Sequence, residues 1–525
     1  MNEELKKKYD TYKKKYNKLK ESHVYKEYNT FEKRKQKLIE LIEDKKNINC
    51  KIYIIGFGSI GRPLLWLLLQ LTTLEQKNIT VIEMRDRDVF ADQFQNVNFL
   101  FNVKLTKENY KLIFKELQQN DLIIDCGYDI GTDDIIKICN KVGASHINSC
   151  IQTWFNDSDD DNDNNNNNND NASLYHLHKK LETVNDNIKN KNFNCIVSMG
   201  CNPGNVSLWV KKGVYKIAES MNIKKVYKED EINKLAQKID IHVIHVSEKD
   251  TQIVHEPKKI NEYCNTWSGT RESYYGEALS YVELSWGTHE NDIKKDFMDE
   301  DITYVGNDFL ILNKMGAYTY AQSWIPYVNK YIGNVICHDE SYTIGKNLTI
   351  KNKKNIVYKP SVYYVYHPCN EASNSIYELK ERNEKYQDKF RLLTNEIISG
   401  RDLLGLTYYL GNGSIYWIGS TLSIDETREL FSHQLDSIIN ATILQVVAGY
   451  ITGIFYLYDL SAENKKIGLI VPDKIPLEYM KYQLPFLGDF LFIEKNKYHL
   501  TLLENNIKSG IGKTTKWNFD NFLIK

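Results

Sequence analysis

The sequence predicts an α/β protein, in which a doubly wound parallel sheet is followed by a second, α+β domain. Short β-branched runs alternate with longer apolar segments of helical length up to about residue 200. A glycine-rich turn joins the first strand pattern to the first helix pattern, and beyond about residue 240 the pattern becomes mixed. A length of 525 residues suits about two to four domains.

Six strands are expected in the first domain, which we place at 49–205. They lie at 51–56, 79–83, 99–103, 122–127, 146–150 and 194–200. In the second domain, at 206–430, strands are expected in IDIHVIHVSE and IVYKPSVYYVYH, and helices at 370–384 and 423–433. The remaining 431–525 form a C-terminal segment.

Within that segment, 441–458 is a run of 18 residues without a charge, and Gly449 and Gly453 are four residues apart in it. A membrane helix is one interpretation. We favour a core helix that packs back on the first domain, because Gln445, two threonines and two glycines dilute the apolar character. No membrane association is therefore expected.

Two segments are predicted to lie outside the folded core. Residues 1–48 are rich in lysine and have few apolar residues, which predicts a solvated helical extension. The Asn-rich stretch 156–172 cannot bury enough apolar surface to offset its ordering entropy, so a disordered insert is expected.

The composition excludes several classes of protein. The 68 Lys and Arg residues balance 69 Asp and Glu residues, which argues against a polybasic nucleic-acid binder. Nine cysteines without a CxxC spacing indicate neither a disulfide framework nor a zinc site. The first residues resemble no targeting signal, so we expect a cytoplasmic protein without a metal.

The strongest motif is the hexapeptide GFGSIG, which follows a buried strand pattern and opens an apolar helix pattern. This context indicates a Rossmann-type dinucleotide site, in which Gly56 allows the turn, Gly58 admits the pyrophosphate and Gly61 lets helix and strand pack. Ser59 and Ile60 complete the loop at the helix N-terminus. A glycine turn without a ligand is the alternative interpretation.

An acid, Glu83, ends the second strand pattern 22 residues after Gly61. It is expected to bind the ribose hydroxyls and to repel a 2′-phosphate, which favours NAD. The nearby Arg85 keeps NADP open. Either cofactor implies hydride transfer without naming the substrate.

Further along the chain, single polar and aromatic residues mark a candidate substrate site. For each, a structural role is an alternative: Asn202 can cap a helix that has Pro203 at its first position, and the others can be rim acids, a core tryptophan or a satisfied histidine. As a set they suit an organic cation, because acids and an aromatic face both attract positive charge. The residues are Asn202, Glu248, Trp267, Glu277 and His367.

Several rare motifs occur in a fixed order: GFGSIGR, CNPG, EKDTQ, NTWS, ELSWGT, YHPCN, YWIGSTLSIDETR and LPFLGDF. In these motifs the chain resembles bacterial-type homospermidine synthases, of the saccharopine dehydrogenase-like group, over about residues 48–495. The resemblance implies polyamine biosynthesis in a homodimer, with the second domain serving substrate binding and dimerisation. It implies that bound NAD takes a hydride from one putrescine and returns it after a second amine has displaced ammonia, without net redox change.

The resemblance also implies roles for single residues. Trp267 would hold a substrate ammonium, Glu277 would pair with an amine, and His367 would carry a proton. Glu248, Asn202 and Asp129 would line the pocket, although the loop before Glu277 is one residue longer than in the family. At Gln152 the family has a glutamate, so the preferred diamine length is left open; the Gln152 carbonyl can still accept a hydrogen bond.

Two alternatives compete with this interpretation. A saccharopine or carboxynorspermidine dehydrogenase would reduce an imine once, but its carboxylate substrates would favour arginines rather than Glu248, Glu277 and Asp129. A non-catalytic NAD-binding module is the second alternative.

Overall fold

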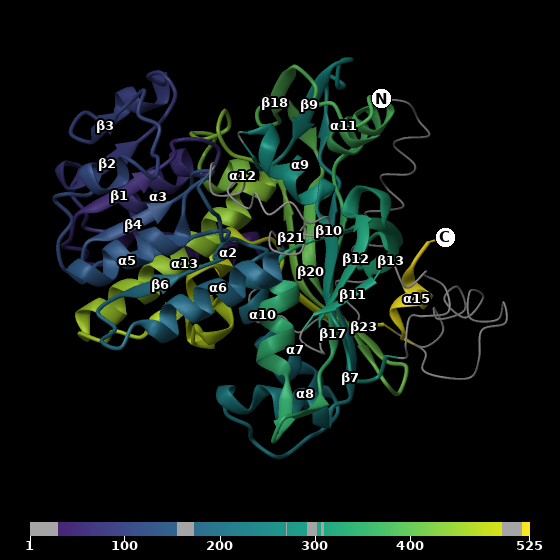
Figure 1. The fold of residues 1–525 in the computed structure, drawn as a ribbon. Helices are drawn as coiled ribbons and strands as arrows, with labels where there is room; N and C mark the ends of the chain where they lie inside the picture. Colours follow the sequence, from purple (N-terminus) through teal and green to yellow (C-terminus); the bar gives the residue numbers. More distant parts are fainter. Residues whose placement is uncertain are drawn as a thin grey trace, which may run out of the picture.

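The computed structural model describes residues 30–154, 173–268, 270–290, 302–305, 309–495 and 517–524. Two sheets stand next to each other, each covered by helices (Figure 1). The first is parallel and comes mainly from the N-terminal part of the chain, and the second is mixed.

The first sheet has seven parallel strands in the order β22-β6-β5-β4-β1-β2-β3, which confirms the predicted Rossmann-type sheet. The six predicted strands are present, somewhat shorter than expected, and β22 was not predicted. This seventh strand comes from the C-terminal segment, where Gly468 pairs with Asn194. The strands are β1 (Ile52–Ile55), β2 (Ile79–Ile82), β3 (Asn98–Leu100), β4 (Leu122–Asp125), β5 (Ser145–Asn148), β6 (Asn194–Ile196) and β22 (Gly468–Ile470).

Helices cover both faces of this sheet (Figure 1). Their apolar residues explain the packing: in α3, for example, the leucines of GRPLLWLLLQL are buried except for Leu69. They are α3 (Gly61–Leu71), α4 (Tyr110–Ile113), α5 (Thr132–Val142), α6 (Leu174–Asn187) and α13 (Ala441–Ala462). Helix α7 (Asn205–Ser220), which follows β6 along the chain, packs on the mixed sheet instead.

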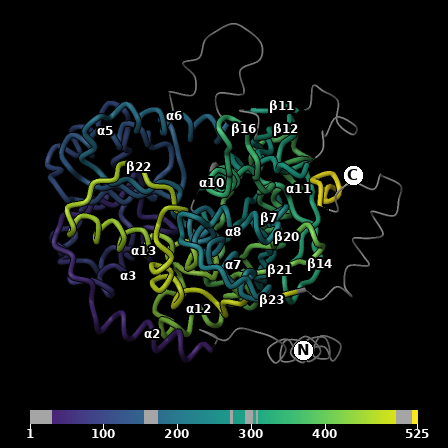
Figure 2. Tube along the Cα trace, turned by 90° about the horizontal axis from the view of Figure 1, so that it is seen from below, coloured from purple at the N-terminus to yellow at the C-terminus, as the bar shows by residue number. Residues whose placement is uncertain are grey.

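Helix α13 is long and apolar enough to cross a membrane, but 89% of its most apolar 18-residue window is buried inside the protein. Its two glycines explain the fit. A Cβ at Gly449 would lie 1.9 Å from the Gly200 oxygen, and one at Gly453 would lie 2.5 Å from Ile147. Tyr450 donates a hydrogen bond of 2.6 Å to the Asp125 carbonyl at the end of β4. The helix therefore packs as a core element against the parallel sheet, within the same half as β22 (Figure 2).

The mixed sheet has ten strands, and β7 lies in its middle, parallel to β17 and antiparallel to β20. One face, with Tyr364 and Tyr366, packs toward α7 and α13, and the other, with Tyr363 and Val365, packs on α15 (Phe519–Phe522). The strands are β7 (Ile241–Asp250), β10 (Tyr281–Ser285), β11 (Ile302–Val305), β12 (Phe309–Met315), β13 (Tyr320–Ile325), β14 (Asn329–Ile336), β17 (Ser361–His367), β20 (Arg401–Leu410), β21 (Ile415–Ser423) and β23 (Leu491–Lys495).

Small two-stranded sheets and helices surround the mixed sheet. The pairs are β8 (Ile253–Val254) with β19 (Ile397–Ser399), β9 (Glu262–Asn265) with β18 (Lys389–Leu392), and β15 (Ile350–Asn352) with β16 (Asn355–Tyr358). The helices are α8 (Ile232–Lys238), α9 (Arg271–Leu279), α10 (Asp339–Leu348), α11 (Asn370–Glu381) and α12 (Ile424–Leu430).

The Lys-rich N-terminal segment departs from the prediction of a solvated extension. Helix α2 (Phe31–Glu43) packs on the body of the protein near α12 (Figure 2). Its Arg34 is 3% exposed and forms ion pairs with Glu426 at 2.8 Å and Asp489 at 3.1 Å. A buried guanidinium with two carboxylates anchors this helix. Residues 1–29 and the predicted insert at 156–172 lie outside the described residues.

Candidate functional site

The glycine turn after β1 has the shape that a dinucleotide needs. Gly56 has φ +87°, and a Cβ at Gly61 would lie 2.1 Å from the Gly56 oxygen, so both positions require glycine. A Cβ at Gly58 would meet only the Arg85 guanidinium, at 3.4 Å. The space above Gly58 is therefore open to a pyrophosphate.

The remaining loop positions fit the same use. Ser59 is buried, and Ile60 is the N-cap of α3 without a side-chain cap, so the first amides of α3 can face an anion. Glu83 lies beneath the turn and accepts hydrogen bonds from Phe57 N at 2.6 Å and from Arg85 Nε at 2.9 Å. Burial opposes the charged form of Glu83, but these hydrogen bonds outweigh it and lower its pKa. Glu83 thus fixes the turn and stays ionised, with Arg85 beside it.

A buried acid, Glu248, lies near the end of β7. Its Oε2 accepts hydrogen bonds from Asn202 Nδ2 at 2.9 Å and from the Tyr364 hydroxyl at 2.7 Å. Burial raises the pKa of Glu248 to about 7, despite these two donors, and the nearby Asp250 contributes to the rise. The carboxyl can therefore gain or lose a proton near neutral pH.

A second acid, Glu277, projects from α9 toward a histidine. Its Oε2 lies 4.0 Å from His338 Nε2, and the side chain is 32% exposed. Burial, with a further contribution from the acids at the start of α10, raises the pKa of Glu277 to about 7, although His338 opposes the rise. Glu277 is thus the more accessible of the two acids and titrates in the same range.

His338 precedes α10 and links the two acids. Its Nδ1 lies 2.7 Å from Glu340, and its ring centroid lies 4.8 Å from that of Tyr364, which binds Glu248. Burial alone would lower the pKa of His338, but Glu340 and Glu277 outweigh it and raise the pKa to about 10. His338 is therefore an imidazolium at neutral pH.

An aromatic wall adjoins these groups. The Trp267 ring lies 5.9 Å from the Tyr366 ring, and Tyr366 stacks on Tyr364 at 5.4 Å. Trp267 is partly exposed, whereas both tyrosines are buried. Among the described residues, neither Glu248 nor Glu277 forms an ion pair with a lysine or arginine. The arrangement is suited to an organic cation.

This cluster lies at the carboxyl edge of the parallel sheet, where open α/β sheets bind ligands. Asn202 and Ser198 belong to the loop after β6, and Ser198 donates a hydrogen bond of 3.0 Å to Asp339, next to His338. From the loop after β4, the Tyr128 hydroxyl comes within 3.9 Å of a Cβ placed at Gly276, beside Glu277. The acids and the glycine turn therefore open on the same edge.

Two predicted pocket residues lie in loops at this edge. Asp129 follows β4 with φ +62°, and it is partly exposed. Gln152 holds that loop: its Oε1 accepts a hydrogen bond from Ile130 N at 3.1 Å, and its Nε2 donates to Cys150 Sγ at 2.9 Å. Gln152 thus uses its amide to support the Asp129 loop.

The helix start expected at Asn202 is wrong. Helix α7 begins at Asn205 with Gly204 as its N-cap. Gly204 has φ +129°, and a Cβ there would lie 2.2 Å from the Gly200 oxygen, so the chain makes a tight turn before the helix. Asn202 lies within this turn, joined to Pro203 by a cis peptide bond, and its side chain points to Glu248 instead of capping the helix.

The structure does not bring His367 into the cluster. Because side chains alternate along a strand, His367 lies on the opposite face of β17 from Tyr364 and Tyr366. There it pairs in register with Lys249, and its Nδ1 lies 2.8 Å from the Pro368 oxygen. His338 occupies the position expected for a histidine. Its sequence signal was the triplet His338-Asp339-Glu340, directly after an apolar strand pattern.

Known proteins are similar to this chain in sequence and in fold. Residues 52–196 match the model of the saccharopine dehydrogenase NADP binding domain. The homospermidine synthases of Mesorhizobium japonicum and Blastochloris viridis are each 28% identical over 489 residues, covering 90% and 91% of this chain and 96% and 98% of theirs. The structure of the Legionella pneumophila homospermidine synthase in complex with NAD is similar at a TM-score of 0.78 and 30% identity, covering 92% of this chain and 99% of that one.

The chain belongs to the homospermidine synthase family. This confirms the resemblance seen in the ordered motifs. The similarity to the Legionella pneumophila structure covers 92% of the chain, so it extends over both sheets and not over the dinucleotide half alone.

Proposed function

We propose that this protein is an NAD-dependent homospermidine synthase, which couples two putrescine molecules and releases ammonia. The observation that carries the proposal is the acidic and aromatic cluster beside the dinucleotide turn. Such a site offers charge complementarity to a diamine, whereas a carboxylate substrate would need cationic partners. Family membership supports the same reaction.

The glycine turn fits NAD, with Gly56, Gly58, Ser59, Ile60 and Gly61 at the pyrophosphate and Glu83 near the ribose. When bound, NAD would supply the redox chemistry, which is removal of a hydride from the amine-bearing carbon of one putrescine and its return to the imine formed with the second amine. The ionised Glu83 favours a ribose hydroxyl over a 2′-phosphate.

The chain's own residues bind and deprotonate the amines. Trp267 holds an ammonium group against its ring, worth about 0.5 to 2 kcal/mol. Glu277 accepts a proton from an amine, because its pKa of about 7 lets it take and return a proton at neutral pH. Glu248, held by Asn202 and Tyr364, binds the deeper amine.

His338 contributes a fixed positive charge between the two acids. As an imidazolium with its Nε2 4.0 Å from the Glu277 carboxyl, it attracts the ionised form of Glu277 and so limits the rise of the Glu277 pKa. Asp129, partly exposed in the loop after β4, would add a further negative charge at the same edge. Burial of Glu248 and Tyr364 excludes water from the inner end, which protects an imine from hydrolysis.

The test is incubation of the purified protein with putrescine and a catalytic amount of NAD. Formation of homospermidine and ammonia without accumulation of NADH supports the proposal. Stoichiometric NADH would identify a dehydrogenase that oxidises the amine once. Absence of both products would identify a non-catalytic NAD-binding module.

A further inference from the structure

Trp267 and Glu277 project from the same outer part of the mixed-sheet domain, and buried contacts join their supports. Strand β9 leads directly into the Trp267 turn, and helix α9 carries Glu277. Tyr263 of β9 and Tyr275 of α9 pack with their ring centroids 4.4 Å apart. Both rings are fully buried, so strand and helix are held face to face.

On the Trp267 side, Asn265 sets the backbone. Its Oδ1 accepts hydrogen bonds from Trp267 N at 2.9 Å and Ser268 N at 2.8 Å, and its Nδ2 donates to the Tyr263 hydroxyl at 2.8 Å. An asparagine used in this way fixes the turn that follows it. The Tyr263 hydroxyl fixes which way the Asn265 amide points.

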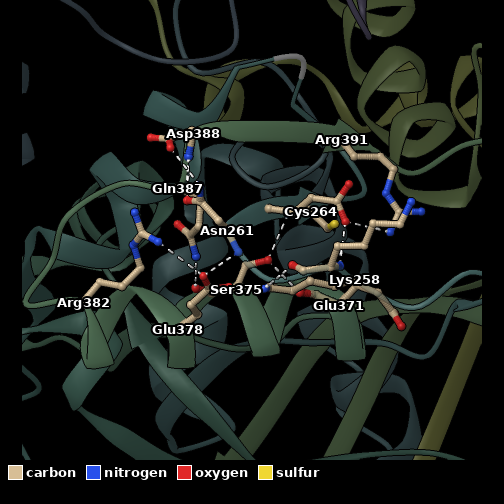
Figure 3. Close-up of polar contacts among 12 residues, drawn as sticks. Lys258, Asn261, Cys264, Glu371, Ser375, Glu378, Arg382, Gln387, Asp388 and Arg391 are labelled. Carbon is tan, nitrogen blue, oxygen red and sulfur yellow. Dashed lines mark hydrogen bonds and ion pairs between the residues drawn. The ribbon is translucent and has the colours of Figure 1, made fainter.

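On the Glu277 side, the contacts run through Gln387. The Tyr275 hydroxyl, two residues before Glu277, donates to Gln387 Oε1. Gln387 Nε2 donates to the Ser375 carbonyl at 2.8 Å, and the Ser375 hydroxyl accepts from Cys264 N of β9 at 2.9 Å. Gln387, Ser375 and Cys264 lie together in Figure 3, with dashed lines marking hydrogen bonds of this network. Strand β9 is therefore joined to α9 in two ways: through hydrogen bonds by way of Ser375 and Gln387, and directly through the packed rings of Tyr263 and Tyr275.

Resting on the proposed function, we propose that Tyr275 and Gln387 are positioning residues, whose hydrogen bond fixes the spacing between Trp267 and Glu277 and thereby the diamine length that the site accepts. Trp267 attracts an ammonium and Glu277 pairs with an amine, so the carbon chain between them must match their separation. Gln387 is fully buried, which leaves its amide no water with which to replace the bond to Tyr275. A misplacement of about 1 Å can cost about 100-fold in rate.

The test compares diamines in two variants. Tyr275→Phe removes the hydroxyl and keeps the ring, and Gln387→Met removes the amide and keeps the length. Each is expected to lower the ratio of kcat/KM for putrescine to that for cadaverine by about 3- to 10-fold, with NAD affinity within about twofold of wild type. The double variant should change the ratio no more than the stronger single variant, because both break one bond.

Tyr358→Phe is the matched control. Tyr358 is buried, and its hydroxyl donates a hydrogen bond of 3.0 Å to the Ile241 carbonyl. Ile241 is the first residue of β7, at the opposite end of the strand from Glu248. This variant loses a hydrogen bond of the same kind, so it should lower thermal stability but leave the diamine ratio unchanged. Equal loss of activity toward all diamines in Tyr275→Phe and Gln387→Met would show a merely structural role and overturn the proposal.

A second measurement separates this inference from the proposed function. Calorimetry of diamine binding to the NADH form needs no turnover, since that form accepts no hydride. Suppose that wild type makes no homospermidine, but that the ratio of the affinities for putrescine and cadaverine shifts in both variants. The synthase proposal then fails and the positioning role stands. If wild type makes homospermidine, and neither the kcat/KM ratio nor the affinity ratio of the two diamines shifts in the variants, the positioning role fails.

Discussion

The dinucleotide turn and the acidic cluster are built in opposite ways. The turn and its acid come from one stretch of chain between β1 and Glu83. The cluster gathers Asn202 from the loop after β6, Glu248 from β7, Glu277 from α9, and His338 from the start of α10. The first site depends on glycines that keep space free. The second depends on two carboxyl groups, Glu248 and Glu277, whose pKa values are raised by burial to about 7.

This difference predicts that the two sites can be damaged separately. In the turn, steric substitutions should abolish NAD binding without touching the diamine groups. In the cluster, changes of charge should lower turnover without touching NAD.

Gly58→Val should lower NAD affinity by more than about 100-fold, because side-chain atoms would fill the space left for the pyrophosphate. The fold should persist, since a Cβ there meets only Arg85 at 3.4 Å. Calorimetric titration with NAD and a thermal melt check both parts. Gly61→Ala should instead destabilise the protein, by about 1 to 3 kcal/mol or more. Full affinity in Gly58→Val would refute the placement of the cofactor.

Glu277→Gln should reduce turnover by about 100-fold or more, because an amide cannot take a proton from an amine. NAD affinity should stay within about twofold of wild type. Steady-state kinetics and NAD titration are the measurements. A parallel loss of NAD affinity would mean that Glu277 supports the fold rather than the chemistry.

His338→Gln and His367→Gln form a matched pair. We expect the first to lower kcat by about 10-fold or more, since it removes the charge between the two acids. The second should leave kcat within about twofold, because His367 lies on the other face of β17 with Lys249. The opposite ranking of the two variants would restore His367 as the proton carrier.

Activity should depend on pH in a direction set by the two acids. Glu248 and Glu277 each have a pKa raised to about 7, and each must lose its proton to pair with an ammonium. The value of kcat/KM for putrescine should therefore fall as pH falls below about 7, by about tenfold per unit or more. Glu277→Gln should make the fall of kcat/KM at low pH less steep. An unchanged fall in this variant would show that a group other than Glu277 causes it.

Trp267→Phe should have the smallest effect, about 2- to 10-fold, mainly in KM for putrescine. A phenyl ring still attracts an ammonium but less strongly than an indole. Trp267→Leu, which keeps bulk without a π face, should be worse. Equal kinetic constants for the two variants would show that Trp267 contributes only its bulk and no attraction to the ammonium.

The same contrast explains what the sequence could predict. The turn was predictable because Gly56, Gly58, Gly61 and Glu83 follow one another at fixed spacing, and local spacing sets their geometry. Strand β22 was not, because three residues carry little pattern and the chain between them and their partner β6 contains most of the mixed sheet. His367 was expected at the site and His338 was not, because which face of β17 points to the acids is decided only by the packed sheet.

Gln152 and Arg34 show the same limit for polar residues. The family resemblance placed Gln152 among the substrate groups, but its amide forms hydrogen bonds with Ile130 N and Cys150 Sγ. Arg34 stands in a lysine-rich segment and looked solvated, yet two acids more than 390 positions later bury it. Long-range ion pairs leave no local trace in composition.

Strand β22 also has a consequence for how the polypeptide is made. Ribosomal synthesis delivers β6 well before Gly468–Ile470 emerge, and all strands of the mixed sheet except β23 are translated in between. During that interval the outer edge of β6 carries unpaired amides and carbonyls, open to pairing with other nascent strands. The parallel sheet thus stays incomplete until most of its neighbour has been translated, and a polypeptide that stops short of β22 would release a sheet with an unprotected border.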